Sequence, residues 1–262
     1  MKISRGEYLA SLEQRRLIYG CRPPGAWRRH YGVIRWLPLV LLCLILSACR
    51  SEGGVPGNPL GIKLQWFSFI DGDGFRDRCV PGASDRYRLI YNARFEEQVR
   101  VYDVSAYGDE AIQVSRAVTP GFSLLQMQGF LDFGWHESKV RLTPAEFSQF
   151  RERLRQSGFF APTPVGLELF SPDFYWIGMS CENGQFHYTA FARPSRAFDA
   201  LTFPEFLFRH DETDIAVNPP RAIPSSERLR AMGGGMGPPE DREPAFRMVV
   251  DEDGLSGDFG LI

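Results

Sequence analysis

The sequence predicts an α+β fold in which a mostly antiparallel sheet carries two helices packed on one face. Three observations predict it: strand-like segments dominate, the helix signals come late, and two strands flank a tight hairpin turn. Residues 61–218 hold 28 of the chain's 35 aromatic residues, including 19 of its 21 Phe. A segment of this length and content can build one hydrophobic core. We therefore expect a single globular α+β domain over residues 61–218.

The clearest strand signal is the hairpin. Residues 175–182 and 185–191 flank Asn183-Gly184, the kind of dipeptide that most strongly favours a two-residue hairpin turn. Such a turn fixes the register and therefore decides which side chains share a face. The core face is expected to pair Cys181 with Phe186, Met179 with Tyr188 and Ile177 with Ala190. Further strands are expected at residues 62–69, 87–92, 98–104, 111–118, 122–133 and 139–142.

The strongest helix signal begins at Thr143. Thr143 can cap the free amides, Pro144 suits the first helical position, and Glu146 can reach back to close a capping box. Apolar residues then recur at helical spacing until Gly158 ends the helix. These are Phe147, Phe150 and Leu154. A second, weaker helix is expected from Ser195 through Leu201, with a restart at Pro204 that continues to Arg209.

Charge is distributed unevenly along the chain. The first 48 residues carry a net charge of +6, and the remaining 214 carry −8. An acidic body without a basic stripe argues against nucleic acid as a partner, because phosphate binding needs clustered cations. The sequence also lacks a glycine-rich phosphate-binding loop, so we expect no nucleotide.

A short apolar run lies near the N-terminus. Residues 36–48, WLPLVLLCLILSA, are uncharged and follow Arg28, Arg29 and Arg35. Thirteen residues are too few to span a bilayer as a helix, which needs about 20. Their length and their basic flank are typical of the hydrophobic region of a signal peptide.

The run ends in Leu46-Ser47-Ala48-Cys49, which resembles the lipobox of bacterial lipoproteins at every position. The resemblance implies that residues 1–48 are a cleaved signal peptide. It also implies that Cys49 becomes the N-terminus and carries a thioether-linked diacylglycerol and an N-acyl chain such as palmitate. Two or more acyl chains anchor a protein to a membrane effectively permanently.

The leader is unusual in its length. Because 35 residues precede the apolar run, we hypothesise that translation starts at Val33. Arg50 follows Cys49, where an Asp would favour retention in the inner membrane, so the resemblance favours the periplasmic face of the outer membrane. The inner membrane is the alternative location. The alternative for the apolar run itself is a buried strand that happens to end in Cys.

Two segments outside the body are poor in apolar periodicity. Residues 49–60 comprise the lipidated Cys and a flexible tether rich in Gly, Pro and Ser. In residues 219–262, 13 of 44 residues are Gly or Pro, so this tail is expected to be disordered. One apolar island within it, residues 246–250, can add to a sheet edge on the body or on a partner.

The cysteines indicate one disulfide. After removal of residues 1–48 and lipidation of Cys49, only Cys79 and Cys181 remain, in an oxidising compartment. We expect them to pair. The alternative is two isolated thiols, with Cys181 a small core residue.

No metal site or cofactor is expected. Asp71, Asp73 and Asp77 resemble a calcium loop at first sight, but the frame places Arg76 where Gly is needed and Gly82 where Glu is needed. A polar turn is the better interpretation. The histidines of the body, His136, His187 and His210, do not lie at metal-ligand spacing.

A catalytic constellation is equally hard to assemble. Ser180 and His187 are expected to be cross-strand neighbours on a solvent-facing side of the sheet, and Asp173 is the nearest candidate acid. No glycine-rich elbow surrounds Ser180. An envelope hydrolase with unidentified catalytic residues is therefore the alternative function.

The aromatic excess suggests a binding surface, although most such residues are usually core. The candidate surface consists of Phe159, Phe160, Tyr175, Trp176, Arg86 and Arg88. The sequence thus predicts a lipid-anchored periplasmic protein that binds an envelope protein, a glycan or another ligand without catalysis.

Overall fold

The computed structural model describes residues 59–118, 134–229 and 245–256. The predicted signal peptide, Cys49, most of the tether and the strand expected at residues 122–133 lie outside these residues. Among the described helices, none is both long enough and apolar enough to cross a membrane.

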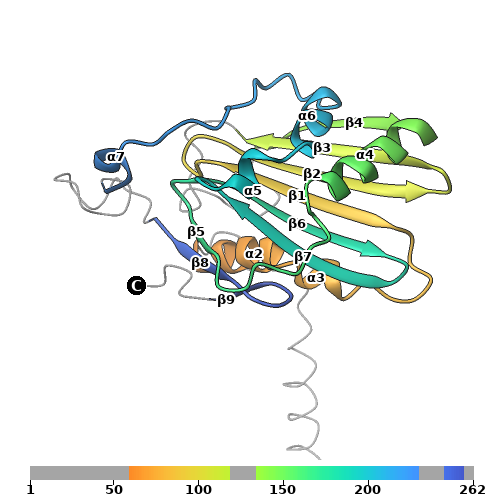
Figure 1. Ribbon diagram of the computed structural model, residues 1–262, viewed down its shortest axis with the longest axis horizontal. Helices are drawn as coiled ribbons and strands as arrows, with labels where there is room; N and C mark the ends of the chain where they lie inside the picture. The colour runs from red at the N-terminus through yellow and green to blue at the C-terminus, as the bar shows by residue number, and fades with distance from the viewer. Residues whose placement is uncertain (1–58, 119–133, 230–244, 257–262) are drawn as a thin grey trace, which may run out of the picture. The chain divides into compact units, whose positions relative to one another are not determined.

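The predicted α+β class is confirmed: a six-stranded antiparallel sheet forms the centre of the fold (Figure 1). Its strands lie in the order β4-β3-β2-β1-β6-β7. Strands of this sheet that follow one another along the chain pair with each other, apart from β4 and β6. Strand β6 pairs instead with β1. The strands are β1 (Arg86–Ala93), β2 (Val99–Tyr107), β3 (Glu110–Val118), β4 (His136–Leu142), β6 (Phe174–Glu182) and β7 (Gln185–Ala192).

The predicted hairpin is confirmed together with its register. Asn183 and Gly184 both have positive φ, as a two-residue turn between twisted strands requires. Cys181 pairs with Phe186, Met179 with Tyr188 and Ile177 with Ala190, as expected.

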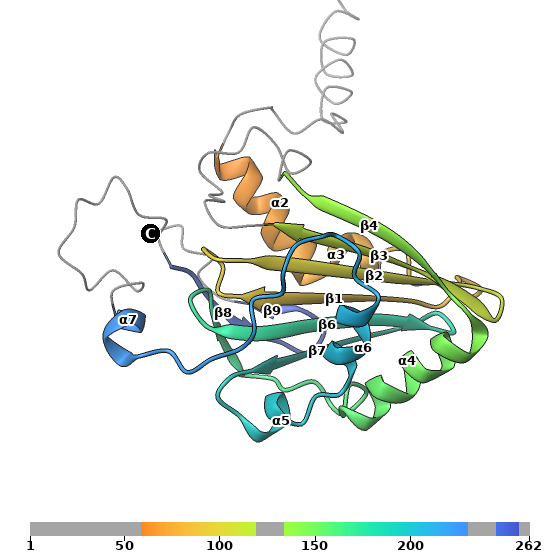
Figure 2. The same cartoon turned by 90° about the horizontal axis from the view of Figure 1, so that it is seen from above.

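One face of this sheet is covered by three helices, α4 (Pro144–Gln156), α5 (Arg196–Asp199) and α6 (Phe203–Arg209) (Figure 2). The predicted capping box is present at α4, where the Glu146 amide donates to the Thr143 hydroxyl and the Thr143 amide donates to Glu146. The predicted second helix forms as two short pieces, because Pro204 lies in the first turn of a new helix. The stripe of α4 packs on the sheet through Phe147, Phe150 and Leu154.

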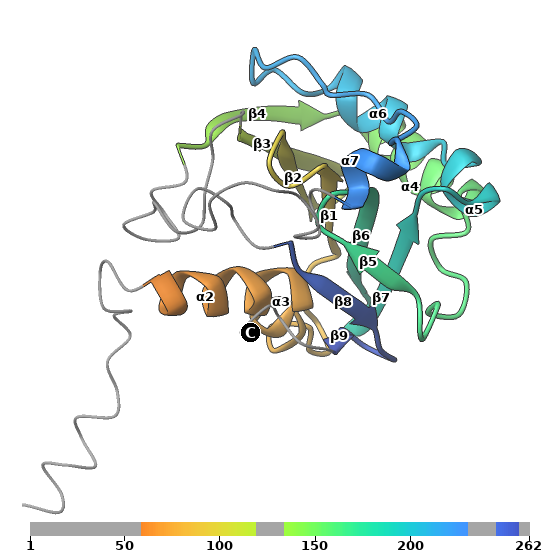
Figure 3. The same ribbon diagram turned by 90° about the vertical axis from the view of Figure 1, so that its left-hand side faces the viewer.

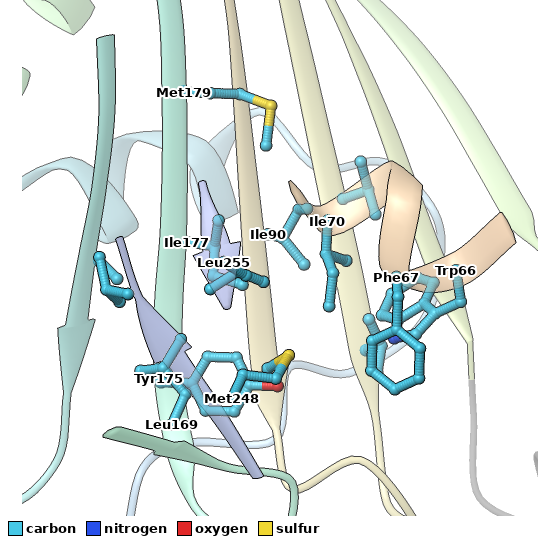
Figure 4. Close-up of a cluster of buried hydrophobic side chains, with 14 of the residues drawn as sticks. Trp66, Phe67, Ile70, Ile90, Leu169, Tyr175, Ile177, Met179, Met248 and Leu255 are labelled. Atoms are coloured by element: carbon cyan, nitrogen blue, oxygen red, sulfur yellow. The ribbon is translucent and has the colours of Figure 1, made fainter. Parts of the chain in front are cut away.

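The opposite face is covered by α2 (Pro59–Asp71), α3 (Asp73–Arg76) and a small sheet of β5 (Glu168–Phe170), β8 (Arg247–Val250) and β9 (Leu255–Ser256) (Figure 3). The strand expected at residues 62–69 is therefore wrong. Over residues 64–71 of α2, the buried side chains are Trp66, Phe67 and Ile70, at the spacing of one helix face, and Figure 4 shows Ile70 beside Ile90 of β1.

The prediction of a disordered tail is wrong for residues 245–256. Strand β8 pairs antiparallel with β5 of the same chain, and Phe246, Met248 and Val250 are buried in the core beneath α2. Figure 4 shows Met248 and Leu255 among the side chains of this core. The domain therefore extends past residue 218, and the apolar island adds to the body rather than to a partner. A short helix, α7 (Ser225–Leu229), precedes it.

The predicted disulfide is confirmed. Cys79 follows α3 and is bonded to Cys181 near the end of β6, across a sequence separation of 102. Closing a loop of this length stabilises a fold by about 4 to 5 kcal/mol in the chain-entropy model. The bridge joins the segment that covers one sheet face to β6, an interior strand of the sheet.

Candidate functional site

The aromatic part of the predicted binding surface is mostly core. Phe159, Tyr175 and Trp176 are fully buried, and the Trp176 ring stacks on Tyr91 at a centroid distance of 4.7 Å. Phe160 alone of the four aromatic residues reaches the surface, with 36% of its area exposed. The prediction fails because both faces of the sheet are covered, so that these aromatic residues pack in the core.

The two arginines of the predicted surface, Arg86 and Arg88, contact side chains of α2 and α3 instead. The Arg88 guanidinium lies over the Phe69 ring at 4.0 Å and donates to Asp103 at 2.7 Å. The Arg86 guanidinium lies over the Phe75 ring at 4.5 Å and donates to a backbone carbonyl. These contacts hold the helices to the sheet on the face opposite to Phe160, so the six predicted residues form no common surface.

The candidate hydrolase residues are not brought together. Ser180 does pair with His187 across the hairpin, but Ser180 is buried rather than facing solvent. His187 Nε2 lies 2.7 Å from the carbonyl oxygen of Phe159, which can only accept, so Nε2 is the donor. Asp173 precedes β6, and Ser180 is the seventh residue of that strand, which separates them by about 20 Å.

The aspartates of the predicted polar turn, Asp71 and Asp73, accept hydrogen bonds within the protein, and Asp71 thereby binds β9. Asp71 accepts from the backbone amide of Leu255, and Asp73 accepts from the Ser68 hydroxyl at 2.7 Å. Burial raises the pKa of Asp71, and the Ser68 hydroxyl lowers the pKa of Asp73. In the part of the chain that the structure describes, no three His, Cys, Asp or Glu side chains gather as metal ligands do.

A pocket of about 230 Å³ lies where β6 begins and β7 ends, at the end of the hairpin away from its turn. Sequence reasoning missed it. Its charged residues are Asp173, Arg193 and Arg221. Its apolar residues are Phe174, Pro194, Ala222 and Ile223.

Arg193 is the best placed cation of this pocket. Its backbone amide donates to the Phe174 carbonyl at 3.0 Å, which extends the β6–β7 ladder by one bond and fixes the residue. Its side chain is 30% exposed, and Nε lies 3.7 Å from Asp199, whose side chain is 64% exposed. The Nη1 atom is buried and makes no hydrogen bond within the described residues. The accessible part of this guanidinium therefore lies on its other atoms.

Arg221 is the second arginine that lines the pocket, and its charge is already paired within the protein. Its Nη2 atom donates to both carboxylate oxygens of Glu97, at 2.6 and 2.8 Å, and Nη1 donates to Asn218. Partial burial raises the pKa of Glu97, but bonds from Arg221 and Asn218 and the charge of Arg94 outweigh it and hold the pKa below its ordinary value. The Arg221 guanidinium lies over the Phe174 ring at 5.4 Å.

The segment that brings Arg221 to the pocket is held by a buried cluster around Arg100. The Arg100 side chain is 0% exposed and donates to the Asp211 carboxylate, the Ile215 carbonyl and the Gln98 side chain. Tyr102 donates to the same carboxylate at 2.7 Å, and burial, followed by the charge of Asp211, raises the Tyr102 pKa. Residues 211–218 are thereby fixed across β2.

A more open depression lies beside this segment, with a volume of about 560 Å³. The side chains that line it are already engaged, since Gln98 bonds to the backbone of Ala216 and Asn218, and Glu97 bonds to Arg221. Its described lining residues include no cation, unlike those of the pocket at Arg193.

Comparisons with protein-family models, with curated proteins and with solved structures found no match for this chain.

Proposed function

We propose that this protein is a lipid-anchored lipoprotein of the bacterial envelope that binds a ligand, or a group of an envelope partner, in the pocket between Arg193 and Arg221. The single observation that carries the binding role is the pocket itself, which Arg193 and Arg221 line and where the Arg193 charge meets only an exposed partner, Asp199, at 3.7 Å among the described residues. The lipobox ending in Cys49 supports the anchor and the periplasmic face of the outer membrane.

The argument from Arg193 is electrostatic. Its side chain is 30% exposed, and its partner Asp199 is 64% exposed at 3.7 Å. An exposed ion pair of this kind contributes about 0 to 1 kcal/mol, so it competes only weakly with another partner for the exposed part of the guanidinium. A guanidinium forms its strongest hydrogen bonds with charged acceptors.

Binding is favoured over hydrolysis by the chemistry of the lining. The described lining residues include no Ser, Cys, Thr or His. A nucleophile needs an adjacent base and an orienting group, and Ser180, His187 and Asp173 do not provide that geometry. Asp173 belongs to the pocket, but Ser180 lies toward the other end of β6.

The anchor is tested by Cys49→Ser. We expect the wild-type chain to sediment with membranes and the variant to leave the membrane pellet, because the thioether needs the Cys49 thiol. Cys43→Ser is the matched control, since Cys43 lies within the apolar run and not at the lipobox. The measurement is fractionation with intact-mass analysis, and a Cys49→Ser chain that still carries a diacylglycerol mass would contradict the anchor.

The binding role is tested by Arg193→Met. We expect the free energy of unfolding to stay unchanged or rise by about 1 kcal/mol, because an unpaired donor is removed while only an exposed pair with Asp199 is lost. Native mass spectrometry of the detergent-extracted protein should show a bound adduct on the wild type that is missing from the variant.

The control is Arg196→Gln, which changes an exposed arginine three residues away that does not line the pocket. It should keep the adduct. A loss of more than about 2 kcal/mol in Arg193→Met by urea unfolding would mark Arg193 as a structural residue, and the proposed function would fail.

A further inference from the structure

We infer that Arg78 and Arg86, together with the Ser105 hydroxyl, bind a phosphate group on the sheet face that carries α2 and α3. This site is separate from the pocket at Arg193, so the inference goes beyond the proposed function. Three observations carry it: the free donor atoms, the elements that bring the three side chains together, and the lack of a carboxylate partner for either arginine.

The Arg86 guanidinium is fixed in place and keeps one atom free for a ligand. It lies over the Phe75 ring at 4.5 Å, and Nη2 donates to the Phe75 carbonyl at 2.6 Å. Nε is buried and out of reach of a ligand, whereas Nη1 is not buried and makes no hydrogen bond to a described residue. An anionic acceptor at Nη1 therefore meets an oriented donor.

The disulfide brings Arg78 to the same place. Cys79, the next residue, is bonded to Cys181, and their Cα atoms lie 5.6 Å apart. Cys181 is in turn the residue of β6 that pairs with Arg86. The Arg78 side chain is exposed, and it makes no hydrogen bond or ion pair with a described residue. Its guanidinium is therefore available to a ligand.

Ser105 of β2 lies directly opposite Arg86. The Ala106 amide donates to the Asp85 carbonyl at 2.8 Å, so the next pair, Arg86 and Ser105, has no mutual backbone bonds. The residues of such a pair lie closest, with about 4.5 Å between their Cα atoms. Ser105 is half-buried, and its hydroxyl is neither buried nor bonded to a described residue. It can donate to a ligand that Arg86 holds.

The neighbouring acidic side chains are committed elsewhere. Asp103 accepts from Arg88 at 2.7 Å and from Arg116 at 2.8 Å. Asp85 accepts from a backbone amide of the β6–β7 turn at 2.9 Å. Among the described residues, no carboxylate therefore forms an ion pair with Arg86.

The charges around Arg86 leave a positive surplus. Burial, followed by the charges of Arg78 and Arg88, lowers the Arg86 pKa. The charge of Asp103 acts in the opposite direction and does not outweigh them. A bound anion removes this repulsion, because an opposite charge favours the charged form of a guanidinium.

Donors from three elements suit a tetrahedral oxyanion. Two guanidinium groups and a hydroxyl approach from the loop after α3, from β1 and from β2, whereas a single guanidinium matches a planar carboxylate. Two sources share this chemistry: a soluble phosphate and the phosphodiester of a lipid headgroup.

Two exposed side chains favour the lipid source. Val80, two residues after Arg78, is 52% exposed, and Tyr107, two residues after Ser105, is 65% exposed. An apolar and an aromatic residue beside cations suit the surface of a bilayer. The lipid source alone rests on the proposed anchor, because the anchor brings the bilayer within reach.

The first experiment is calorimetric titration of the detergent-extracted, full-length lipoprotein with inorganic phosphate. We expect Arg86→Gln and Arg78→Gln each to bind phosphate at least about fivefold more weakly than the wild type, because each loses a charged hydrogen bond. Arg78→Gln removes no contact with a described residue, so a loss of binding in this variant is not a loss of folding.

The matched control is Arg155→Gln. Arg155 is an exposed arginine of α4, which packs on the other face of the sheet. This variant should bind phosphate as the wild type does. Arg193→Met should also bind phosphate unchanged, since Arg193 belongs to the pocket.

A second experiment separates the two sources. The full-length lipoprotein is placed in phosphatidylcholine nanodiscs with or without phosphatidylglycerol, and hydrogen exchange of residues 77–88 is followed by mass spectrometry. Slower exchange with phosphatidylglycerol that is lost in Arg78→Gln identifies a lipid headgroup. Slower exchange only after addition of inorganic phosphate identifies a soluble phosphate.

Three results would overturn the inference. These are equal phosphate affinity of Arg78→Gln and the wild type, an equal loss of affinity in Arg155→Gln, and the absence of any effect of phosphate or phosphatidylglycerol. An Arg193-dependent adduct found beside such a result leaves the proposed function standing. Phosphate binding that depends on Arg78 in a protein without that adduct keeps this site and removes the pocket.

Discussion

A chain truncated after residue 244 is expected to lose its cooperative unfolding transition. The truncation removes Phe246, Met248, Val250 and Leu255, all buried in the core beneath α2. Burial of each such side chain is worth about 1.5 to 3 kcal/mol, an upper estimate, so the loss approaches the whole stability of an ordinary domain at 5 to 15 kcal/mol. Urea unfolding followed by tryptophan fluorescence measures it, since Trp66 lies in this core.

Two substitutions within the same strand sharpen this test. Met248→Ala should cost about 2 to 5 kcal/mol, because Met248 is fully buried. Arg247→Gln should stay within about 0.5 kcal/mol, because Arg247 is exposed and pairs with an exposed Glu168. A truncated chain that unfolds cooperatively within 2 kcal/mol of the full chain would contradict the core described here.

The second large effect is expected for Arg100→Met. Removal of the guanidinium leaves the Asp211 carboxylate buried beside Tyr102 without its cation, and frees the Ile215 carbonyl. Removal of one partner of a buried ion pair typically lowers the free energy of unfolding by about 3 to 5 kcal/mol. The loss is measured as the change in the free energy of unfolding in urea.

The matched control is Arg209→Met, which removes an exposed arginine that pairs with Glu205 one turn away. It should cost less than about 1 kcal/mol. The double variant Arg100→Met/Asp211→Leu should recover part of the loss, because no unpaired charge stays buried. If Arg100→Met costs no more than the control, the cluster does not fix residues 211–218.

Local signals explain the parts of the fold that the sequence could predict. The hairpin register depends on Asn183-Gly184 and α4 depends on its capping box, so neighbouring residues decide both. The disulfide followed from arithmetic, because two body cysteines allow only one pairing.

The failures occurred where distant packing overrides local pattern. Residues 62–69 mix apolar and polar side chains in a way that suits a strand or a helix. Distant packing favours the helix, as where Phe67 meets Phe246, just before β8, at a centroid distance of 5.2 Å. The tail was judged by its average Gly and Pro content, which hides a five-residue apolar island.

The candidate site could not be predicted for a similar reason. Arg193 and Arg221 are 28 positions apart, and only the return of residues 211–218 across β2 brings them to one pocket. No local motif marks either residue.

The core beneath α2 joins the first and last described elements of the chain. Phe67 packs on Phe246, and Asp71 accepts from the Leu255 amide, so this face stays open until residues 245–256 are present. During synthesis the core beneath α2 therefore cannot close until these residues have left the ribosome. The β6–β7 hairpin, by contrast, needs only neighbouring residues and can form much earlier.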